Sequence, residues 1–235
     1  MFVPVAYATL FALLRHLPVA RAALVGWAFG LGQFGFGLSW IAESFYVDAE
    51  RFGAIAIPAV AGLSAGLAIF PAAAAALFTG VARRHAIEGV MACLLFATCW
   101  TAAEWLRGHA LTGFPWNLAG YALVDYAALR QPAAWIGSYG LSFLVILVGA
   151  LAAPAPFAET RARWSILLLG VGIVVATWSA GVARLQLEPP SPPGLDLRIV
   201  QGNVPQQEKW APENREATLT RYLDLSTRPG PVDIL

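Results

Sequence analysis

Six long apolar stretches constrain the fold of this chain more than any other feature of its sequence. They cover roughly residues 2–15, 22–46, 54–81, 86–106, 132–153 and 164–183. A helix needs about 20 predominantly apolar residues to cross the hydrocarbon core of a bilayer. We therefore predict that residues 1–184 form a polytopic α-helical membrane bundle of about six spans.

The overall composition supports a membrane protein. Hydrophobic residues make up 58% of the 235 residues and charged residues 12%, whereas an ordinary globular domain is about 45–50% apolar and about 25% charged. So few charges cannot cover a soluble surface, which excludes a soluble monomer and a disordered chain. The formal net charge of +1 lacks the basic excess of a nucleic-acid-binding protein, so we expect no nucleic-acid partner.

Arginines mark alternate connections between the predicted spans. The first, third and fifth connections each carry a pair, namely Arg15 and Arg21, Arg83 and Arg84, and Arg161 and Arg163. Because basic loops stay in the cytoplasm, six spans place both ends of the chain outside. An outside N-terminus without a leader is unusual, so we expect at least one further span upstream.

Small and polar residues inside the stretches predict close helix packing. Gly26 and Gly30 form one G-x-x-x-G pattern, and Gly62 and Gly66 form another. Such pairs let helix backbones approach each other in a bilayer. Gln33 is a polar residue in the middle of a span, and we expect it to bond a neighbouring helix.

The two cysteines suggest neither a disulfide framework nor a metal site. Cys93 and Cys99 lie six residues apart in one apolar stretch, which predicts two small buried hydrophobic residues. They imply neither a disulfide nor a metal site. We expect neither a metal nor another cofactor.

The composition changes sharply after Arg184. Residues 185–194 hold four prolines and are predicted to be a stiff, extended linker, because proline fixes φ and cannot continue a helix. Residues 195–235 have an ordinary charge density and are predicted to begin a second domain, which is incomplete in this chain.

The pattern of that second segment is strand, helix, strand. Residues 195–200 alternate and then become fully apolar, as a strand does. Residues 212–226 predict a helix with proline in its first turn, and residues 232–235 resemble a second strand. This βα(β) order opens an α/β layer fold. The helix is expected to bury a stripe formed by Leu219, Tyr222 and Leu223.

One motif with candidate site residues follows the fourth apolar stretch. Residues 112–121 read T-G-F-P-W-N-L-A-G-Y, and Phe114 and Trp116 suit a membrane interface. A guanidinium can bind a phosphate, so Arg107, which precedes them, is a candidate to hold a lipid phosphate on the outer leaflet. The alternative is that Glu104 and Arg107, three residues apart, pair with each other and the aromatic residues only anchor the chain.

A second motif follows the first predicted strand. It reads V-Q-G-N-V-P-Q-Q-E-K-W over residues 200–210. Sites collect at strand ends in α/β folds, which makes Gln201, Asn203 and Trp210 candidates for substrate contact. A purely structural loop explains this motif equally well on its own.

Together the two motifs are specific. Several spans, G-F-P-W-N-x-x-G-Y, a proline-rich linker and V-Q-G-N-V-P-Q-x-x-K-W, in this order, resemble the apolipoprotein N-acyltransferases of bacteria over nearly the whole chain. The resemblance implies a multi-pass protein of the bacterial inner membrane. It also implies that residues 185–235 begin an extracytoplasmic nitrilase-like domain, an α-β-β-α sandwich.

The resemblance also implies a reaction, the final step of bacterial lipoprotein maturation. An acyl chain passes from a membrane phospholipid to the N-terminal S-diacylglyceryl-cysteine of an apolipoprotein. Both molecules are then partners of the protein. A Glu-Lys-Cys triad carries the chain as a thioester in such enzymes, which divides one difficult step into two easier ones.

The triad itself matches no position of this chain. The family's glutamate would follow shortly after Leu235, and Lys209 belongs to another motif, so we assign no catalytic residue and expect these 235 residues alone to be inactive. Trp210 matches an active-site tryptophan of the family. Five further substrate-binding candidates rest on position, namely Gln201, Asn203, Phe114, Trp116 and Arg107.

Two other functions remain alternatives. A membrane transporter would place ionisable groups along a path through the bilayer, whereas the charges here cluster near the ends of the apolar stretches. A membrane-anchored nitrilase-like amidase, or an acyltransferase with another acceptor, would share both motifs.

Overall fold

The structure of the chain is a computed structural model that describes residues 3–153, 160–187, 194, 196–205, 208–209 and 211–230, without the side chains of 160–163. The chain divides into two units. The first comprises Met1–Trp40 with Pro58–Leu187, and the second comprises Ile41–Ile57 with Glu188–Leu235.

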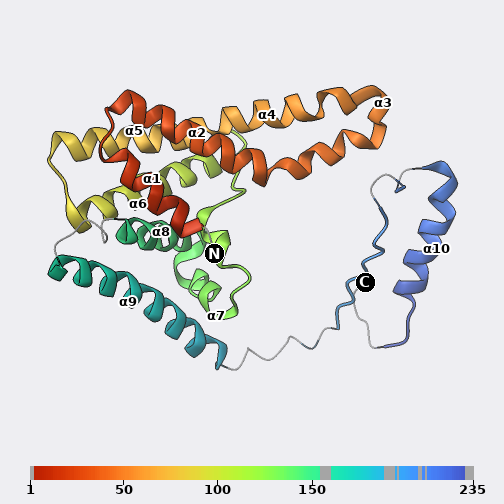
Figure 1. The fold of residues 1–235 in the computed structure, drawn as a ribbon. Helices are drawn as coiled ribbons and strands as arrows, with labels where there is room; N and C mark the ends of the chain where they lie inside the picture. The colour runs from red at the N-terminus through yellow and green to blue at the C-terminus, as the bar shows by residue number, and fades with distance from the viewer. Residues whose placement is uncertain are drawn as a thin grey trace. The chain divides into compact units, whose positions relative to one another are not determined.

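The first unit is a bundle of helices (Figure 1). Each of the six apolar stretches forms helix, so the predicted membrane bundle is confirmed as a helical architecture. α2 packs on α5, α6 packs on α5 and α8, and α8 also contacts α1 and α9. The elements are α1 (Val3–Leu14), α2 (Val19–Gly37), α4 (Ala56–Leu67), α5 (Ile69–Arg84), α6 (Gly89–His109), the short η4 (Ala119–Leu123) and α7 (Ala127–Arg130), α8 (Ala133–Ala152) and α9 (Thr160–Leu185).

Four helical segments of the described residues are long and apolar enough to cross a membrane. They are Ser39–Arg84, Gly89–His109, Ala133–Ala152 and Trp164–Leu185, and Val3–Leu14 is a shorter apolar helix. These lengths and compositions fit a membrane protein.

Two of the predicted boundaries are wrong. The stretch predicted as 22–46 forms an α-helix only to Gly37 and continues in the 3-10 helix η1 (Ser39–Ser44). The stretch predicted as 54–81 is interrupted at Ala68, between α4 and α5. Pro71 has no N–H to donate to the carbonyl four residues earlier, which favours a helix end just before it.

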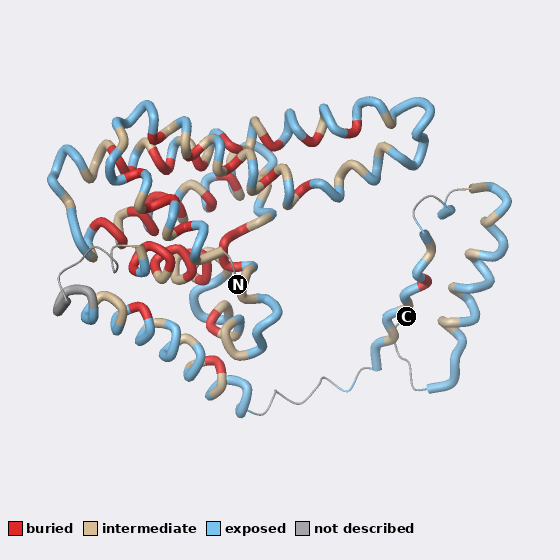
Figure 2. The backbone as a smooth tube through the Cα atoms, in the orientation of Figure 1, coloured by how far each residue is buried: buried red, intermediate tan, exposed pale blue. Residues whose placement is uncertain are grey.

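Aromatic rings form the centre of the first unit. Tyr7, Phe11, Phe78, Phe96 and Trp100 are all at most 2% exposed. Their ring centroids lie 5.3–6.4 Å apart, mostly edge to face or tilted. In a bilayer, this kind of van der Waals packing holds helices together in place of a hydrophobic driving force. Figure 2 shows the buried residues gathered in this part of the bundle.

The two glycine pairs differ. A Cβ atom at Gly26 would lie 2.6 Å from the carbonyl oxygen of Pro71, and one at Gly30 would lie 2.8 Å from the Pro71 ring. This pair therefore permits the contact between α2 and α5, as predicted. At Gly62 and Gly66 no described atom lies within 4 Å of such a Cβ, so the packing role predicted for the second pair is wrong within the described residues.

The two cysteines behave as predicted. Cys93 is 0% exposed and Cys99 is 6% exposed, and both are free. They pack as small apolar side chains on α6.

The second unit contains short helical turns and one longer helix. The turns are η2 (Tyr46–Asp48), α3 (Ala49–Phe52) and η3 (Gly53–Ile55). The predicted C-terminal helix is confirmed, with η6 (Pro212–Asn214) leading into α10 (Arg215–Ser226).

Of the two strands expected on either side of α10, only the first lies largely within the described residues, and it is not formed there. Residues 196–200 show an isolated bridge at Leu197 and no strand, and residues 232–235 lie outside the described residues. A β-strand requires hydrogen bonds to a neighbouring strand. Of the expected α/β unit, the described residues therefore show only the helix. Most of the predicted linker, 188–193, also lies outside the described residues, while α9 extends into its start at Leu185.

The prediction that α10 buries a stripe of three residues is wrong for two of them. Leu219 is 58% exposed and Leu223 is 54% exposed. Tyr222 is half-buried against Gly202, and Arg198 donates hydrogen bonds to the carbonyls of Ser226 and Arg228. Within the described residues, one extended segment thus covers one side of the helix, which is too little to bury a full apolar stripe.

Candidate functional site

The loop of residues 110–118 that follows α6 has an unusual backbone. Leu111, Gly113 and Asn117 have φ angles of 56°, 73° and 55°. Positive φ is unfavourable for residues other than glycine, and an internal bond from the Gly113 N–H to the Ala110 carbonyl, at 2.9 Å, closes only one turn. The loop therefore depends on support from neighbouring side chains.

Arg107 supplies much of that support. Its Nη1 atom donates hydrogen bonds to the carbonyl oxygens of Phe114, at 2.5 Å, and Trp116, at 2.7 Å. The guanidinium carbon lies 4.9 Å from the centre of the Phe34 ring on α2, and Arg107 is 2% exposed. One buried arginine thus joins α6, α2 and both candidate aromatic residues.

Glu104, one turn earlier on α6, holds the far end of the loop. Its Oε1 atom accepts a hydrogen bond from the Ala119 N–H at 2.9 Å, and Glu104 is 4% exposed. The next N–H, of Gly120, donates to Oγ of the buried Ser142 on α8 at 2.9 Å. Glu104 and Arg107 therefore bond the loop rather than each other, which corrects the simple pairing considered from their spacing.

Gln33 on α2 is the third polar residue that bonds the loop. Its Nε2 atom donates to the Asn117 carbonyl at 2.9 Å. The expectation that Gln33 bonds a neighbouring helix is therefore wrong, since its partner is loop backbone. Gly37 lies so close to the Asn117 amide that a Cβ atom there would collide with it.

Buried polar atoms without a hydrogen-bond partner concentrate at this loop. The described residues contain seven such side-chain atoms. Four of them belong to this one cluster, namely Gln33 Oε1, Glu104 Oε2, Arg107 Nη2 and Asn117 Nδ2. Unpartnered buried polar groups are rare in proteins and call for an explanation where they gather.

An apolar cleft of about 700 Å³ opens beside the same loop, between α1, α2 and residues 117–122. This volume falls within the range of about 300–1,000 Å³ typical of ligand sites. Gln33 and Asn117 contribute polar groups to a wall that is otherwise largely apolar, formed by side chains such as Tyr7, Phe29, Phe36 and Leu118.

The candidate aromatic residues lie at the surface of the loop. Trp116 is 52% exposed, and its ring centroid is 5.8 Å from that of Trp40, which is 54% exposed. Phe114 is half-buried. The Tyr121 hydroxyl donates to the Pro115 carbonyl at 3.1 Å, which ties the aromatic segment together.

The second motif forms a separate exposed turn. Gln201 Oε1 accepts a hydrogen bond from the Asn203 N–H at 3.2 Å, and Asn203 has a φ of 47°. Both side chains are exposed, while Gly202 between them is buried. Trp210 lies outside the described residues. The structure thus brings together Arg107, Phe114 and Trp116 in one cluster, and Gln201 with Asn203 in another.

Sequence reasoning missed several members of the loop cluster. Asn117 lies within the G-F-P-W-N motif, so its position was a usable signal. Phe34 and Ser142 carry no local signal, because only the packing of α2 and α8 brings them to the loop.

Comparison with known proteins shows which family this chain resembles. Residues 1–151 match the family of the apolipoprotein N-acyltransferase N-terminal domain. Proteins named apolipoprotein N-acyltransferase are similar to this chain in Rhodopseudomonas palustris (38% identity over 89% of the chain), Photobacterium profundum (35% over 100%) and Bradyrhizobium diazoefficiens (39% over 91%). The chain spans 39%, 44% and 40% of the lengths of these relatives. It belongs to the apolipoprotein N-acyltransferase family.

Proposed function

We propose that the protein carrying this chain transfers an acyl group from a membrane phospholipid to the N-terminal S-diacylglyceryl-cysteine of apolipoproteins. The family match carries this proposal, because the relatives' names state both the acceptor and the N-acyl transfer. The reaction passes through a thioester acyl-enzyme, in which a thiolate attacks the phospholipid ester, lysophospholipid leaves, and the acceptor amine then resolves the thioester.

The apolar cleft beside loop 110–118 is suited to the acyl donor. An acyl chain would lie against Tyr7, Phe29 and Phe36, with its ester near the amides of Gln33 and Asn117. Because an ester oxygen can only accept, the relevant group is the Asn117 Nδ2 donor, which has no hydrogen-bond partner in the described residues. This arrangement separates the apolar tail from the polar ester, as a phospholipid requires.

Arg107 acts in this proposal as a positioning residue. Because Arg107 is 2% exposed and two of its bonds go to loop carbonyls, it holds Phe114 and Trp116 in place rather than meeting lipid phosphate at the surface. Trp116, half exposed beside Trp40, is suited to the bilayer interface, where aromatic rings collect.

We further propose that the loop cluster and residues 185–235 lie on the extracytoplasmic side of the bacterial inner membrane. The arginines of the α1–α2 and α5–α6 connections support this orientation. Gln201, Asn203 and Trp210 would then contact substrate from the nitrilase-like domain, outside the bilayer. The triad would come from residues other than these 235.

The function is tested with the protein expressed from the complete open reading frame. The purified protein is incubated with phospholipid vesicles and a synthetic S-diacylglyceryl-cysteine peptide, and the peptide mass is measured. We expect the mass to increase by one acyl group and an equimolar amount of lysophospholipid to form. An intact, folded protein that leaves the peptide unchanged would refute the proposal.

The substrate role of Trp210 is tested by Trp210→Ala in the same full-length protein. We expect N-acylation to fall more than protein abundance does. Trp178→Ala is the control, because Trp178 is 52% exposed on α9, outside both motifs. If Trp210→Ala retains the rate of the control, Trp210 does not belong to the site.

A further inference from the structure

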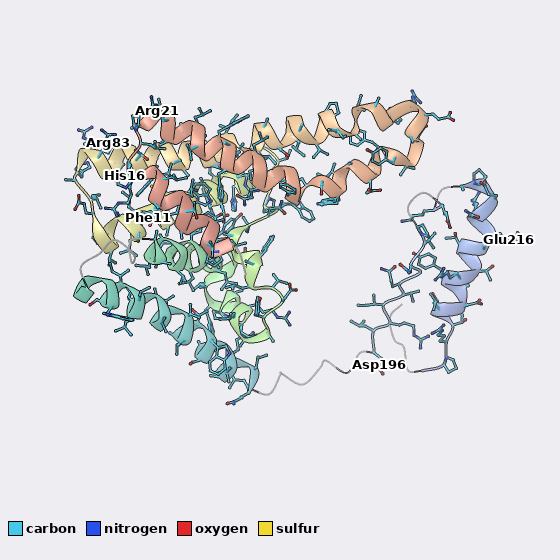
Figure 3. The ribbon with its side chains drawn as sticks, viewed as in Figure 1. Phe11, His16, Arg21, Arg83, Asp196 and Glu216 are labelled. Carbon is cyan, nitrogen blue, oxygen red and sulfur yellow. The ribbon has the colours of Figure 1, made fainter. Side chains whose placement is uncertain are left out.

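A second cavity lies at the opposite end of the bundle from loop 110–118. It has a volume of about 280 Å³ and lies between the end of α1, the end of α5 and the connection from α5 to α6. Figure 3 shows His16, Arg21 and Arg83 at this end of the bundle. No motif and no residue of the proposed acyl-transfer site belongs to it.

The floor of this cavity is apolar and belongs to the bundle core. Leu14, Phe78 and Ala92 line it, and each is at most 1% exposed. Thr79 also lines it and is 2% exposed, and its Oγ1 atom has no hydrogen-bond partner in the described part of the chain. A buried hydroxyl without a partner costs free energy, so it favours a ligand that offers an acceptor or a donor at this point.

Two arginines form the rim. Arg15 and Arg83 both line the cavity and are both exposed. Arg83 Nη1 donates to the Leu17 carbonyl at 3.1 Å, which uses one of the five N–H donors of its guanidinium and fixes the side chain at the rim. The Arg15 guanidinium carbon lies 5.8 Å from the centre of the Phe11 ring.

The charge around the cavity favours an anion. Four arginines and one glutamate lie in the two connections or in the adjoining helix ends, namely Arg15, Arg21, Arg83, Arg84 and Glu88, so their formal charges sum to +3. Glu88 itself lines the cavity and lowers the attraction without reversing it. A metal cation is disfavoured in this field.

We propose that this cavity binds the phosphodiester headgroup of an anionic phospholipid in the leaflet opposite the acyl-transfer site. The cavity has a cationic rim, a buried hydroxyl beneath it, and a position at the end of apolar helices, where headgroups lie. Basic pockets between the ends of membrane helices bind such headgroups. The lipid would bridge α1 and α5 and stabilise this end of the bundle, independently of the acyl transfer.

The test uses the full-length protein, delipidated in a neutral detergent. Thermal unfolding is followed while phosphatidylglycerol, phosphatidylcholine or inorganic phosphate is added. We expect phosphatidylglycerol to raise the unfolding temperature at concentrations at which phosphatidylcholine and inorganic phosphate do not. Equal effects of both lipids, or stabilisation by inorganic phosphate alone, would overturn the proposal, the latter by indicating a site for a soluble anion.

Variants then locate the site. Arg15→Gln and Arg83→Gln should each weaken the effect of phosphatidylglycerol about fivefold, since one basic residue near an anionic lipid contributes about that factor. Thr79→Val should also weaken it and keep the fold, because its hydroxyl has no partner to lose. Arg51→Gln, in the connection between α2 and α4, is the matched control. The proposal fails if the three variants respond to the lipid as the control does.

These variants also separate this site from the acyl-transfer site. Arg15→Gln and Arg83→Gln should keep the rate of N-acylation measured in saturating phospholipid. A protein that binds phosphatidylglycerol at these residues and transfers no acyl group would support this inference while refuting the proposed function.

Discussion

Arg107 is the residue whose substitution tests the candidate site most directly. Its guanidinium donates to the carbonyls of Phe114 and Trp116 from inside the protein, and its charge lies over the Phe34 ring. We predict that Arg107→Met destabilises the protein strongly, that Arg107→Lys destabilises it less, and that both release the loop.

The expected magnitude follows from these contacts. A hydrogen bond to a charged group contributes about 1.5–3 kcal/mol, so losing two of them in Arg107→Met costs about 3–6 kcal/mol before any relaxation. The Glu104 side chain also loses a nearby opposite charge, although the two side chains do not bond each other, so this loss stays below the cost of breaking a bonded buried ion pair. Because the two effects overlap, we expect a total of about 3–5 kcal/mol. A lysine ammonium replaces the charge but not the bonding to two carbonyls, so we expect Arg107→Lys to cost about 1.5–3 kcal/mol.

The free energy of unfolding is measured by titrating the full-length protein with SDS in mixed micelles, and release of the loop by protease cleavage within residues 110–118. Arg51→Met is the control, because Arg51 is exposed. If Arg107→Lys matches the wild type in stability and loop protection, the positive charge alone accounts for the contribution of Arg107 to stability, as it would at a site that binds a phosphate. In that case our reasoning from the two hydrogen bonds is wrong. If Arg107→Met matches the control, the loop does not depend on Arg107.

The remaining predictions concern glycines on the apolar helices. Gly32→Leu fills the proposed acyl cleft, since Gly32 lines it and has no described atom within 4 Å of its Cβ position. The rate of N-acylation should fall about tenfold to hundredfold because the donor is misplaced. Gly35→Leu, on the same helix but outside the cleft, should stay near the wild-type rate. Equal rates in the two variants would remove the cleft from the donor site. Gly26→Ala should cost about 1–3 kcal/mol of unfolding free energy by overpacking against α5, and Gly62→Ala should gain about 0.5–1 kcal/mol in helix propensity, both measured by the SDS titration. Destabilisation by Gly62→Ala would show that this glycine packs against a neighbour after all.

The helices of the bundle could be predicted from the sequence because a membrane helix is specified by its length and its apolarity. The six apolar stretches and the helix at 212–226 are helical. The boundaries near Gly37 and Ala68 could not be read in the same way. The residues beyond Gly37 still include apolar side chains such as Trp40 and Ile41, so hydropathy does not mark where the α-helix stops.

The candidate site was predictable in its location and less so in its bonding. The G-F-P-W-N motif identified the loop, yet the spacing of Glu104 and Arg107 favoured a pair on one helix face. In the structure, Arg107 donates to a backbone carbonyl of the folded loop, and Glu104 accepts a hydrogen bond from the backbone N–H of Ala119 instead. Local spacing cannot predict this outcome, because the competing backbone groups of Phe114, Trp116 and Ala119 belong to a loop whose path depends on left-handed residues such as Asn117.

The unpartnered atoms around the loop also have a physical consequence for the site. Lipid tails offer no hydrogen bonds, so each such group in hydrocarbon costs several kcal/mol. A cavity of about 10 Å³ lies between α2, α5 and α6 and is lined by Gln33, Glu104 and Arg107, each of which contributes one of the unpartnered atoms. That volume is close to the minimum of about 10–15 Å³ for one water, which needs two to four polar partners. A single water bonded to all three would satisfy most of the cluster without reaching the acyl cleft, so the polar support of the loop and the apolar path of the donor can lie side by side in one bundle.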